Sequence, residues 1–493
     1  MKQYRCDVVI VGSGAGGSAC ARAVAEAGLD TIVLEMGSRQ TPETFTQKEE
    51  EMIPKLFQQA GSRTNTDKTI AILQGKGVGG STLHNLNLCK RISPTLLDRW
   101  AETQALPDLP TRLTEAYKVI EKDLNVTRVT EARVNRHNDL FRKGCQALEF
   151  EHATLHHNRV GCVGAGFCEL GCAYDAKQNA AKVLLPQAEH AGARILPQHR
   201  VTRIHSRWGR TTGVSGLLTQ PGQSPQHFRV HASLVVMAAS ATGSSALLLA
   251  SGLGNRHTGR GLHIHPAATV GADFADPVYG WKGVPQSVEC TEFLDPVDAD
   301  RRTWILPVFA HPAGTAGLIP GVGGDLMRQM LRYPHMAAAS AMLHDHGSGS
   351  ITTTRDGQPR IHYRLDPRDG QALVHGMVET AKIWLAAGAT EVMIPFAHPV
   401  YLQSTEQAER LRQHTPRPLD PTLMAVHPMG SLAMAGTAEK GACGPWGQVW
   451  GTQGLYAADG SLFPSSTGGP PQLTIYAIGH MVGTHIGLEF GHP

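Results

Sequence analysis

The sequence predicts an α/β fold in which an α+β lobe is inserted into a Rossmann-like dinucleotide-binding domain. The first observation is at the N-terminus, where an apolar, β-branched run at 8–11 leads directly into GSGAGG at 12–17. An alanine-rich amphipathic helix, an apolar strand at 31–34 and Glu35 follow. Strand, G-x-G-x-x-G, helix, strand and acidic residue form the dinucleotide-binding fingerprint in its full context. The second observation is that strand and helix patterns return late in the chain, at 454–487. The third is that the region before them, from about 265 to 426, has the pattern of an α+β lobe.

Each part of the fingerprint has a physical role. Gly12 allows the tight turn, Gly14 lets a pyrophosphate approach the backbone, and Gly17 packs the helix against the strand. The first turn of the helix offers unpaired N–H groups to the phosphate charge. Glu35 can accept hydrogen bonds from a ribose diol. The alternative is a glycine-rich turn in an ordinary α/β sheet.

Length and composition narrow the class of protein. A chain of 493 residues is too long for one ordinary core, so two or more lobes are expected. The net charge of +3 comes from scattered Lys and Arg, which argues against nucleic acid or an anionic membrane as a partner. No apolar run is long enough to cross a bilayer, and no apolar signal core precedes the first strand. We therefore expect a cytoplasmic protein by default.

The middle of the chain contains the elements of a second lobe. A glycine-rich segment at 75–85 follows an apolar strand, which indicates backbone pressed against something flat or charged. Residues 95–150 have helical periodicity. From about 265 to 426 short strands surround one clear helix, as in an α+β lobe, and a final helix is expected at 471–487.

The motifs resemble those of the glucose–methanol–choline (GMC) oxidoreductases, flavoproteins that oxidise alcohols. The matching segments are LEMG at 34–37, KGVGGSTLHN at 76–85, AASATGSSALLLASG at 238–252, GRGLHIHP at 259–266, VHPMG at 426–430 and GLYAADGSLFPSSTGGPPQLTI at 454–475. The resemblance implies FAD, a doubly wound binding domain assembled from separated segments, and an antiparallel substrate lobe. The predicted domains are an FAD-binding domain (1–94, 177–265 and 427–493), a helical segment with a Cys-rich loop (95–176) and a substrate-binding domain (266–426).

The resemblance also assigns residues to the cofactor. It places Gly12, Gly14, Gly17 and Glu35 on the ADP half of FAD, Gly79, Gly80 and Asn85 along the pyrophosphate and flavin, Val201 at the adenine, Asp459 and Gly460 at the strand-end turn, and Gln472 beneath the flavin pyrimidine. A helix that begins at Gln472 would stabilise negative charge on the reduced flavin.

His84 has two interpretations. Some members of the family attach FAD covalently to a histidine four residues after the Gly-Gly pair, which corresponds to His84 here. The alternative is a histidine that only packs near the isoalloxazine ring.

His427, in the HPMG motif, is predicted to be the catalytic base. In the family this histidine accepts the alcohol proton as hydride leaves carbon, and imidazole has a pKa suited to that role. The family's usual partner, an Asn or His, is replaced by Pro470, whose side chain can neither donate nor accept. His398, His344 and His346 are candidate substitutes.

Three of the nine cysteines, Cys162, Cys168 and Cys172, lie in one glycine-rich loop with the spacing C-x5-C-x3-C. This favours thiols or a metal site over a disulfide framework. The spacing resembles that of FAD sugar dehydrogenases with a [3Fe–4S] cluster, and also a loop of long-chain alcohol oxidising relatives. The alternatives are zinc, with His156 or His157 as a fourth ligand, and three free thiols.

The favoured function is an FAD-dependent dehydrogenase that oxidises a sugar, sterol or long-chain alcohol by hydride transfer to flavin N5. An iron–sulfur cluster would pass the electrons to an acceptor subunit or cytochrome, and co-export with such a partner would allow a periplasmic location. A GMC oxidase that converts O₂ to H₂O₂ is the second hypothesis. Non-alcohol flavin chemistry, suggested by Pro470, and a non-catalytic flavin subunit are the others.

Overall fold

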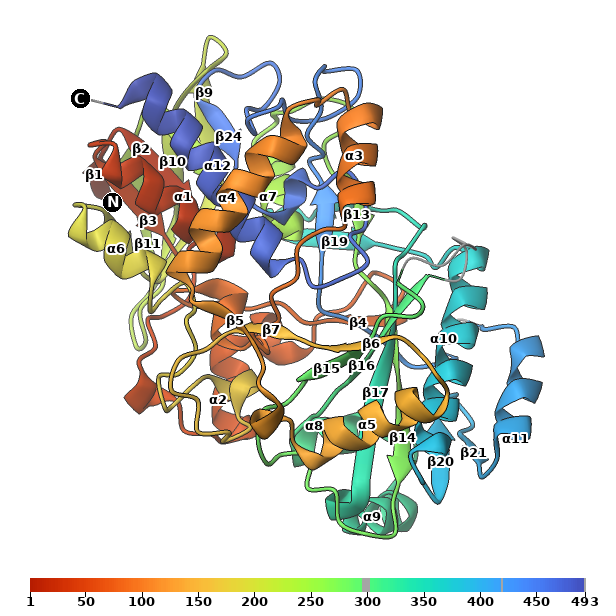
Figure 1. The fold of residues 1–493 in the computed structure, drawn as a ribbon. Coiled ribbons are helices and arrows are strands. Elements are labelled where there is room, and N and C mark those ends of the chain that lie inside the picture. Colours follow the sequence, from red (N-terminus) through yellow and green to blue (C-terminus); the bar gives the residue numbers. More distant parts are fainter. Residues whose placement is uncertain (295–301, 418–419, 492–493) are drawn as a thin grey trace.

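The computed structural model describes residues 1–294, 302–417 and 420–491, and it has two lobes (Figure 1). A five-stranded sheet forms the centre of the first lobe. In spatial order its strands are β24 (Leu455–Ala457), β12 (Leu234–Met237), β2 (Val8–Val11), β3 (Thr31–Leu34) and β8 (Arg194–Leu196). Every neighbouring pair is parallel. The prediction of a Rossmann-like domain assembled from separated segments is therefore confirmed.

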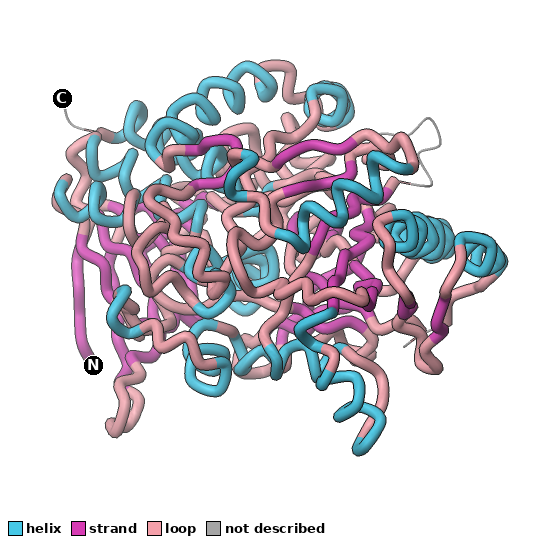
Figure 2. The backbone as a smooth tube through the Cα atoms, turned by 60° about the horizontal axis from the view of Figure 1, so that its bottom comes forward, coloured by secondary structure: helices cyan, strands magenta, loops and turns pink. Residues whose placement is uncertain are grey.

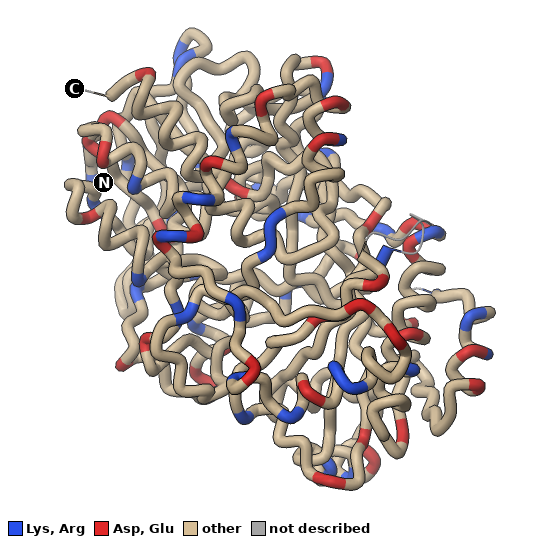
Figure 3. Tube along the Cα trace, in the orientation of Figure 1, with Lys and Arg blue, Asp and Glu red and all other residues tan. Residues whose placement is uncertain are grey.

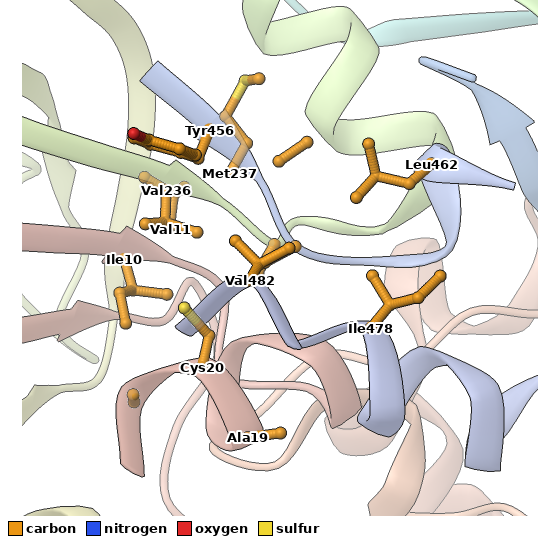
Figure 4. Packing of buried hydrophobic residues seen from close by; sticks show 14 of the residues in the cluster. Ile10, Val11, Ala19, Cys20, Val236, Met237, Tyr456, Leu462, Ile478 and Val482 are labelled. Atoms are coloured by element: carbon orange, nitrogen blue, oxygen red, sulfur yellow. The ribbon is translucent and has the colours of Figure 1, made fainter. Parts of the chain in front are cut away.

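The core of this lobe lies between the parallel sheet and two helices, α1 (Ala15–Glu26) and α12 (Gln472–Phe490). Figure 4 shows Ile10 and Val236 of the sheet with Cys20 of α1 and Val482 of α12. All four side chains are fully buried. Burial of a Val or Ile side chain contributes roughly 1.5–3 kcal/mol. The first and last helices of the chain are thus fixed to one sheet.

A second sheet completes the first lobe. Its strands are β1 (Lys2–Arg5), β11 (Gln226–His231), β10 (Arg210–Leu218) and β9 (His199–Arg207). The helices of this lobe and its surroundings are α2 (Glu49–Leu56), α3 (Pro94–Thr103), α4 (Leu109–Asp123), α5 (Arg136–Ala147), α6 (Leu184–His190) and α7 (Ser240–Ala250). Figure 2 shows many of the helices on the outside of the molecule, with strands between them.

The second lobe is built on a nine-stranded sheet, and most of its neighbouring pairs are antiparallel. Its main path runs through β21 (Val400–Leu402), β20 (Glu391–Ile394), β14 (Ala267–Asp273), β17 (Met336–Leu343), β16 (Thr303–Pro307), β15 (Val288–Cys290) and β6 (His152–Thr154). β22 (Leu423–Ala425) joins β14, and β4 (Ile70–Ile72) joins β22. The helices are α8 (Pro312–Leu318), α9 (Gly323–Leu331), α10 (Pro367–Ala386) and α11 (Thr405–Arg410). β4 and β6 come from outside 266–426, and the domain limits remain a prediction.

A small antiparallel sheet adjoins the cavity described below. Its strands are β19 (Pro359–His362), β18 (Gly349–Thr353), β13 (Arg260–His263) and β23 (Met429–Ser431). His263 of β13 pairs with Met429 of β23. Continuing this antiparallel register by two residues places His265 opposite His427, so the small sheet positions the predicted base.

Among the described residues, none of the helices is both long and apolar enough to cross a membrane. β5 (Val126–Arg128) and β7 (His156–Asn158) pair as a separate two-stranded antiparallel ladder. Figure 3 shows positively and negatively charged residues interspersed along the chain, in agreement with the small net charge.

Candidate active site

One cavity of about 1290 Å³ brings together residues from both ends of the chain. Small-molecule pockets are usually about 300–1,000 Å³, so this cavity has room for more than a small substrate. Of the thirteen residues predicted to bind the cofactor or act as base, eleven line it: Gly12, Gly14, Glu35, Gly80, His84, Asn85, Val201, His427, Asp459, Gly460 and Gln472. The other two lie just behind the wall. Gly17 packs against Gly12, and the N–H of Gly79 donates to the hydroxyl of Ser13.

Gly12 and Gly14 of the fingerprint have different surroundings. At Gly12, with φ at +107°, a Cβ would lie 2.2 Å from the carbonyl oxygen of Ala238, so the turn excludes any side chain. A Cβ on Gly14 would meet only the Cα of Gly80, at 3.9 Å. Protein packing therefore leaves space beside Gly14, and the N-terminus of α1 has no side-chain cap. Open backbone N–H groups beside free space fit a pyrophosphate.

Glu35 has a second role that the sequence did not predict. Its carboxylate accepts hydrogen bonds from the Ser13 N–H (3.2 Å) and hydroxyl (2.6 Å), the Gly37 N–H (2.9 Å) and the Gly77 N–H (3.2 Å). Burial raises the pKa of this carboxyl group, and these hydrogen bonds oppose the shift. Glu35 therefore joins the two glycine-rich segments while it faces the cavity.

The far end of the cavity is held by side-chain hydrogen bonds. Asn85 donates to Oε1 of Gln472 over 2.6 Å, and Nε2 of Gln472 donates to the carbonyl of Leu88 over 2.7 Å. Asp459 accepts from the N–H of Ser461 at 2.8 Å and from the hydroxyl of Ser244 at 2.6 Å. These contacts fix the start of α12 against the segment that follows the second glycine-rich loop. The donors and acceptors that line this end fit the polar edge of a flavin.

His84 lies in the wall as a neutral ring. Its Nε2 atom is buried and has no hydrogen-bond partner among the described residues. The ring packs on Phe57 with centroids 4.0 Å apart. Burial, assisted by the charge of Lys177, lowers the pKa of His84 to about 3. An unprotonated nitrogen suits a covalent bond to flavin as well as simple packing, and the bond remains a prediction.

Lys177 is a buried cation that sequence reasoning missed. Its ammonium group donates to the carbonyls of Leu83 (3.0 Å), Asn85 (2.6 Å) and Cys168 (2.9 Å), and burial lowers its pKa to about 8. Lys177 thus connects the cysteine loop to the residues on either side of His84. The sequence around Lys177 gave no signal for this role, because all three acceptors are backbone carbonyls.

The structure gives no support to the predicted iron–sulfur or zinc site. Within residues 1–294, 302–417 and 420–491, no group of three or more His, Cys, Asp or Glu side chains is arranged to hold a metal ion. Cys162, Cys168 and Cys172 are free thiols, and the sulfur of Cys172 accepts from the N–H of Ala176 at 3.3 Å. The loop instead contributes Glu169 to the cavity, and burial raises the pKa of this carboxyl group to about 7.

His427 lines the cavity and contacts a second histidine, His265. The two Nδ1 atoms are 3.2 Å apart, and the rings meet edge to face. Burial lowers the pKa of His427 to about 4, so the ring is neutral near neutral pH. His265 is fully buried and has a φ of 51°, a left-handed conformation that is rare for residues other than glycine. Such strained residues concentrate at functional sites.

The hydrogen bonds determine which nitrogen of His265 carries the proton. The N–H of Gly468 donates to Nε2 of His265 over 3.1 Å, so this nitrogen is an acceptor. Burial also holds the pKa of His265 well below its usual value, which keeps the ring neutral. Its proton is therefore on Nδ1, and it is donated to Nδ1 of His427. In this arrangement neutral His427 carries its own proton on Nε2.

The candidate substitutes for the missing Asn or His lie elsewhere. His344 bonds to the carbonyl of Ser466 at 3.1 Å, His346 contacts Asp369 at 2.9 Å, and His398 is exposed. None of the three is among the cavity-lining residues, whereas Pro470 is. His265 is the histidine that contacts the predicted base. Its motif, GLHIHP, was visible in the sequence, but the pairing of β13 with β23 was not.

Comparisons with known proteins identify the family of this chain. The GMC oxidoreductase models match residues 53–267 and 345–479, and an FAD-binding domain model matches 7–46. An uncharacterised GMC-type oxidoreductase of Mycobacterium tuberculosis is 34% identical over 96% of this chain and 74% of its own. The long-chain-alcohol oxidase FAO3 of Arabidopsis thaliana is 28% identical over 98% of this chain and 68% of its own.

Solved structures show the same fold. Pyridoxine 4-oxidase from Mesorbium loti superposes with a TM-score of 0.74 at 15% identity, covering 99% of this chain and 100% of that one. Formate oxidase gives a TM-score of 0.72 at 14% identity, with 99% of each chain covered. The family matches and the residues that line the cavity lead to one conclusion: this chain belongs to the GMC oxidoreductase family and is an FAD-dependent oxidoreductase.

Proposed function

We propose that this protein is an oxidase of long-chain primary alcohols, which converts R–CH₂OH and O₂ into R–CHO and H₂O₂. The observation that carries the proposal is that His427, paired with His265, shares one cavity with most of the residues predicted to bind FAD. The relatives support an oxidase reaction, since they include long-chain-alcohol oxidases of Arabidopsis thaliana and the paromamine 6'-oxidase of Streptomyces fradiae.

FAD, when bound, would supply the acceptor for the hydride from the carbinol carbon and the route by which its two electrons reach O₂. The residues described above would hold it. Gly14 and the N-terminus of α1 would receive the pyrophosphate, and Glu35 the ribose. Asn85 and Gln472 would contact the flavin edge, where the start of α12 favours negative charge. FAD affinity measured with Gly14→Leu tests this assignment, because the added side chain meets little protein and fills the ligand space.

His427 would act as the base for the alcohol proton. To accept at Nε2, it must carry its own proton on Nδ1 and donate it to Nδ1 of His265. His265 then has its proton on Nε2 and loses the bond from Gly468. Such a loss costs about 1–3 kcal/mol. General-base catalysis contributes about 10²–10⁴-fold, or roughly 3–5 kcal/mol, so the rearranged pair still favours reaction.

The lining of the second lobe favours a long aliphatic substrate over a sugar. Apolar side chains line the cavity beyond His427, among them Leu306, Val308, Phe309, Met336, Met342 and Met424. β14 and β17 add small residues, such as Ala267, Gly271 and Ala338. A sugar has a hydroxyl on most carbons, and the polar lining residues of this lobe, such as Thr269, Gln286 and Ser340, would pair with only part of them. A hydrocarbon chain would gain from burial against the apolar side chains.

The electron acceptor separates the oxidase from the dehydrogenase. The main reason to expect an external acceptor subunit or cytochrome was the iron–sulfur cluster. The described residues do not form a site for it. Oxygen uptake during oxidation of hexadecan-1-ol, with stoichiometric H₂O₂, is the expected result. Turnover is therefore measured in two separate assays, one with O₂ alone and one with an artificial acceptor. Turnover that requires the artificial acceptor, together with iron and acid-labile sulfide in anaerobically purified protein, would establish the dehydrogenase.

A further inference from the structure

Helices α8 and α9 form a hairpin that buries none of its helical residues. The segment 312–331 instead exposes large apolar side chains. Val322 is 83% exposed, Met327 63% and Leu331 74%. In Figure 1, α9 lies at the extreme end of the second lobe, away from the FAD-binding lobe. An apolar side chain kept in water at such a position is a candidate contact for something outside the molecule.

Hydrogen bonds anchor both ends of the α8–α9 hairpin. The N–H groups of Ala313 and Gly314 donate to the carboxylate of Glu49 on α2, each at 2.8 Å. Beyond α9, Arg332 donates to Asp273 at 2.7 Å, and the Tyr333 hydroxyl donates to the carbonyl of Ala310 at 2.8 Å. These bonds hold both ends of the segment to the body of the protein. The exposed side chains lie between them.

The inner side of the same hairpin lines the cavity. Leu318, Ile319, Arg328 and Gln329 belong to the lining that also contains His427. The hairpin therefore lies at an outer end of the space that leads to the predicted base. A substrate that entered from this side would pass the hairpin.

We propose that the α8–α9 hairpin docks on a neutral lipid surface and admits the long-chain alcohol directly from it. The proposal rests on the proposed function, because a long alkyl alcohol resides in lipid rather than in water. Burial of these three apolar side chains would remove roughly 200–400 Å² of surface from water in all. A stable protein partner would need about 800 Å² on this side, so these residues suit shallow insertion into lipid better than a second copy of the chain.

The charges of the hairpin favour neutral lipid. Arg328 pairs with Asp325 on α9, and Arg332 pairs with Asp273. Figure 3 shows both signs of charge at this end of the molecule. Because the arginines are matched by carboxylates, attraction to an anionic surface contributes little. Docking should therefore persist at high salt, where surface electrostatics are screened.

Flotation of the FAD-loaded protein with phosphatidylcholine vesicles tests the proposal. Wild type and the control Trp208→Asp/Leu488→Asp, which changes side chains 84% and 85% exposed in the other lobe, should float with the vesicles at low and high salt. Met327→Asp/Leu331→Asp should bind about a hundredfold more weakly, since each side chain contributes about tenfold or more to partition. Failure of wild type to float, or equal binding by both double variants, would overturn the proposal.

Kinetics separate docking from the proposed function. For hexadecan-1-ol held in the vesicles, Met327→Asp/Leu331→Asp should lower kcat/KM about tenfold or more, whereas its kcat/KM for water-soluble butan-1-ol should equal that of wild type. A protein that oxidises neither alcohol disproves the proposed function, and flotation still decides the docking. Light scattering that shows a wild-type dimer split by the same two substitutions would assign this face to a second copy instead, which contradicts lipid docking.

Discussion

Nδ1 of His265 lies 3.2 Å from Nδ1 of His427, and the pairing of β13 with β23 is what brings these two rings together. The first prediction concerns this contact. His265→Asn places a side-chain oxygen where Nδ1 stood, so it can accept from Nδ1 of His427 and leave Nε2 free as base. His265→Leu has no acceptor and also leaves the Gly468 N–H without its partner.

The Leu variant should lower kcat/KM about five- to a hundredfold, which corresponds to about 1–3 kcal/mol for a lost buried hydrogen bond. The Asn variant should recover most of that loss. Flavin content and melting temperature of each variant provide the control. Equal kcat/KM in both variants, at equal flavin content, would show that His265 only fills space.

The pH dependence of alcohol oxidation should show the lowered pKa of His427. The neutral ring is the base, so kcat/KM should be constant near neutral pH and fall as the pH drops through about 4. An unperturbed histidine would produce this fall near 6.5. Observing the acid limb of kcat/KM at the ordinary value would mean that burial does not keep His427 neutral.

The same shift links folding stability to pH. Because the folded-state pKa of His427 lies below its ordinary value, the unfolded chain binds more protons between about 4 and 6.5. Stability should therefore be fully present above about 6.5 and decrease as the pH falls through this window. His427→Gln should reduce this dependence when unfolding is followed by denaturant titration. Other histidines whose pKa values are lowered by burial, among them His84, His137 and His265, would maintain the remainder.

Glu35→Ala should weaken FAD binding by about 1.5–3 kcal/mol, because a charge-assisted hydrogen bond to the ribose is lost. It should also lower the melting temperature of the FAD-free protein, since Glu35 joins Ser13, Gly37 and Gly77. Glu189→Ala is the control, because it removes only a surface ion pair with Arg39. FAD affinity equal to that of the control would reject the ribose contact.

Denaturation in acid tests the covalent link at His84. If Nε2, which has no partner among the described residues, is bonded to the flavin, the yellow colour should stay with the precipitated protein. His84→Ala should then release it. Flavin that leaves the wild-type protein entirely would assign His84 to packing against Phe57.

Much of the FAD-binding lobe could be predicted from the sequence, because its signals are local. A four-residue apolar strand, the three fingerprint glycines and an acidic residue lie within 8–35, and the spacing alone specifies strand, turn and helix. The ends of elements were less accurate. The final helix, expected at 471–487, runs from Gln472 to Phe490.

The partner of His427 could not be predicted, because it depends on long-range pairing. His265 and His427 are 162 positions apart and meet only through the register of β13 with β23. Lys177 was missed for a similar reason, since two of its three acceptors, the carbonyls of Leu83 and Asn85, lie more than 90 positions away along the chain. The cysteine spacing, in contrast, gave a strong local signal for a metal site that the described residues do not form.

Anaerobic addition of hexadecan-1-ol to the purified flavoprotein tests the central claim most directly. We expect the visible flavin absorption of the wild type to bleach with one equivalent of alcohol. His427→Ala should bleach about 10²–10⁴-fold more slowly at equal flavin content, because it lacks the base. Wild-type flavin that stays oxidised with every alcohol, or a His427→Ala variant that bleaches at the wild-type rate, would contradict the proposed reaction or the role of His427, respectively.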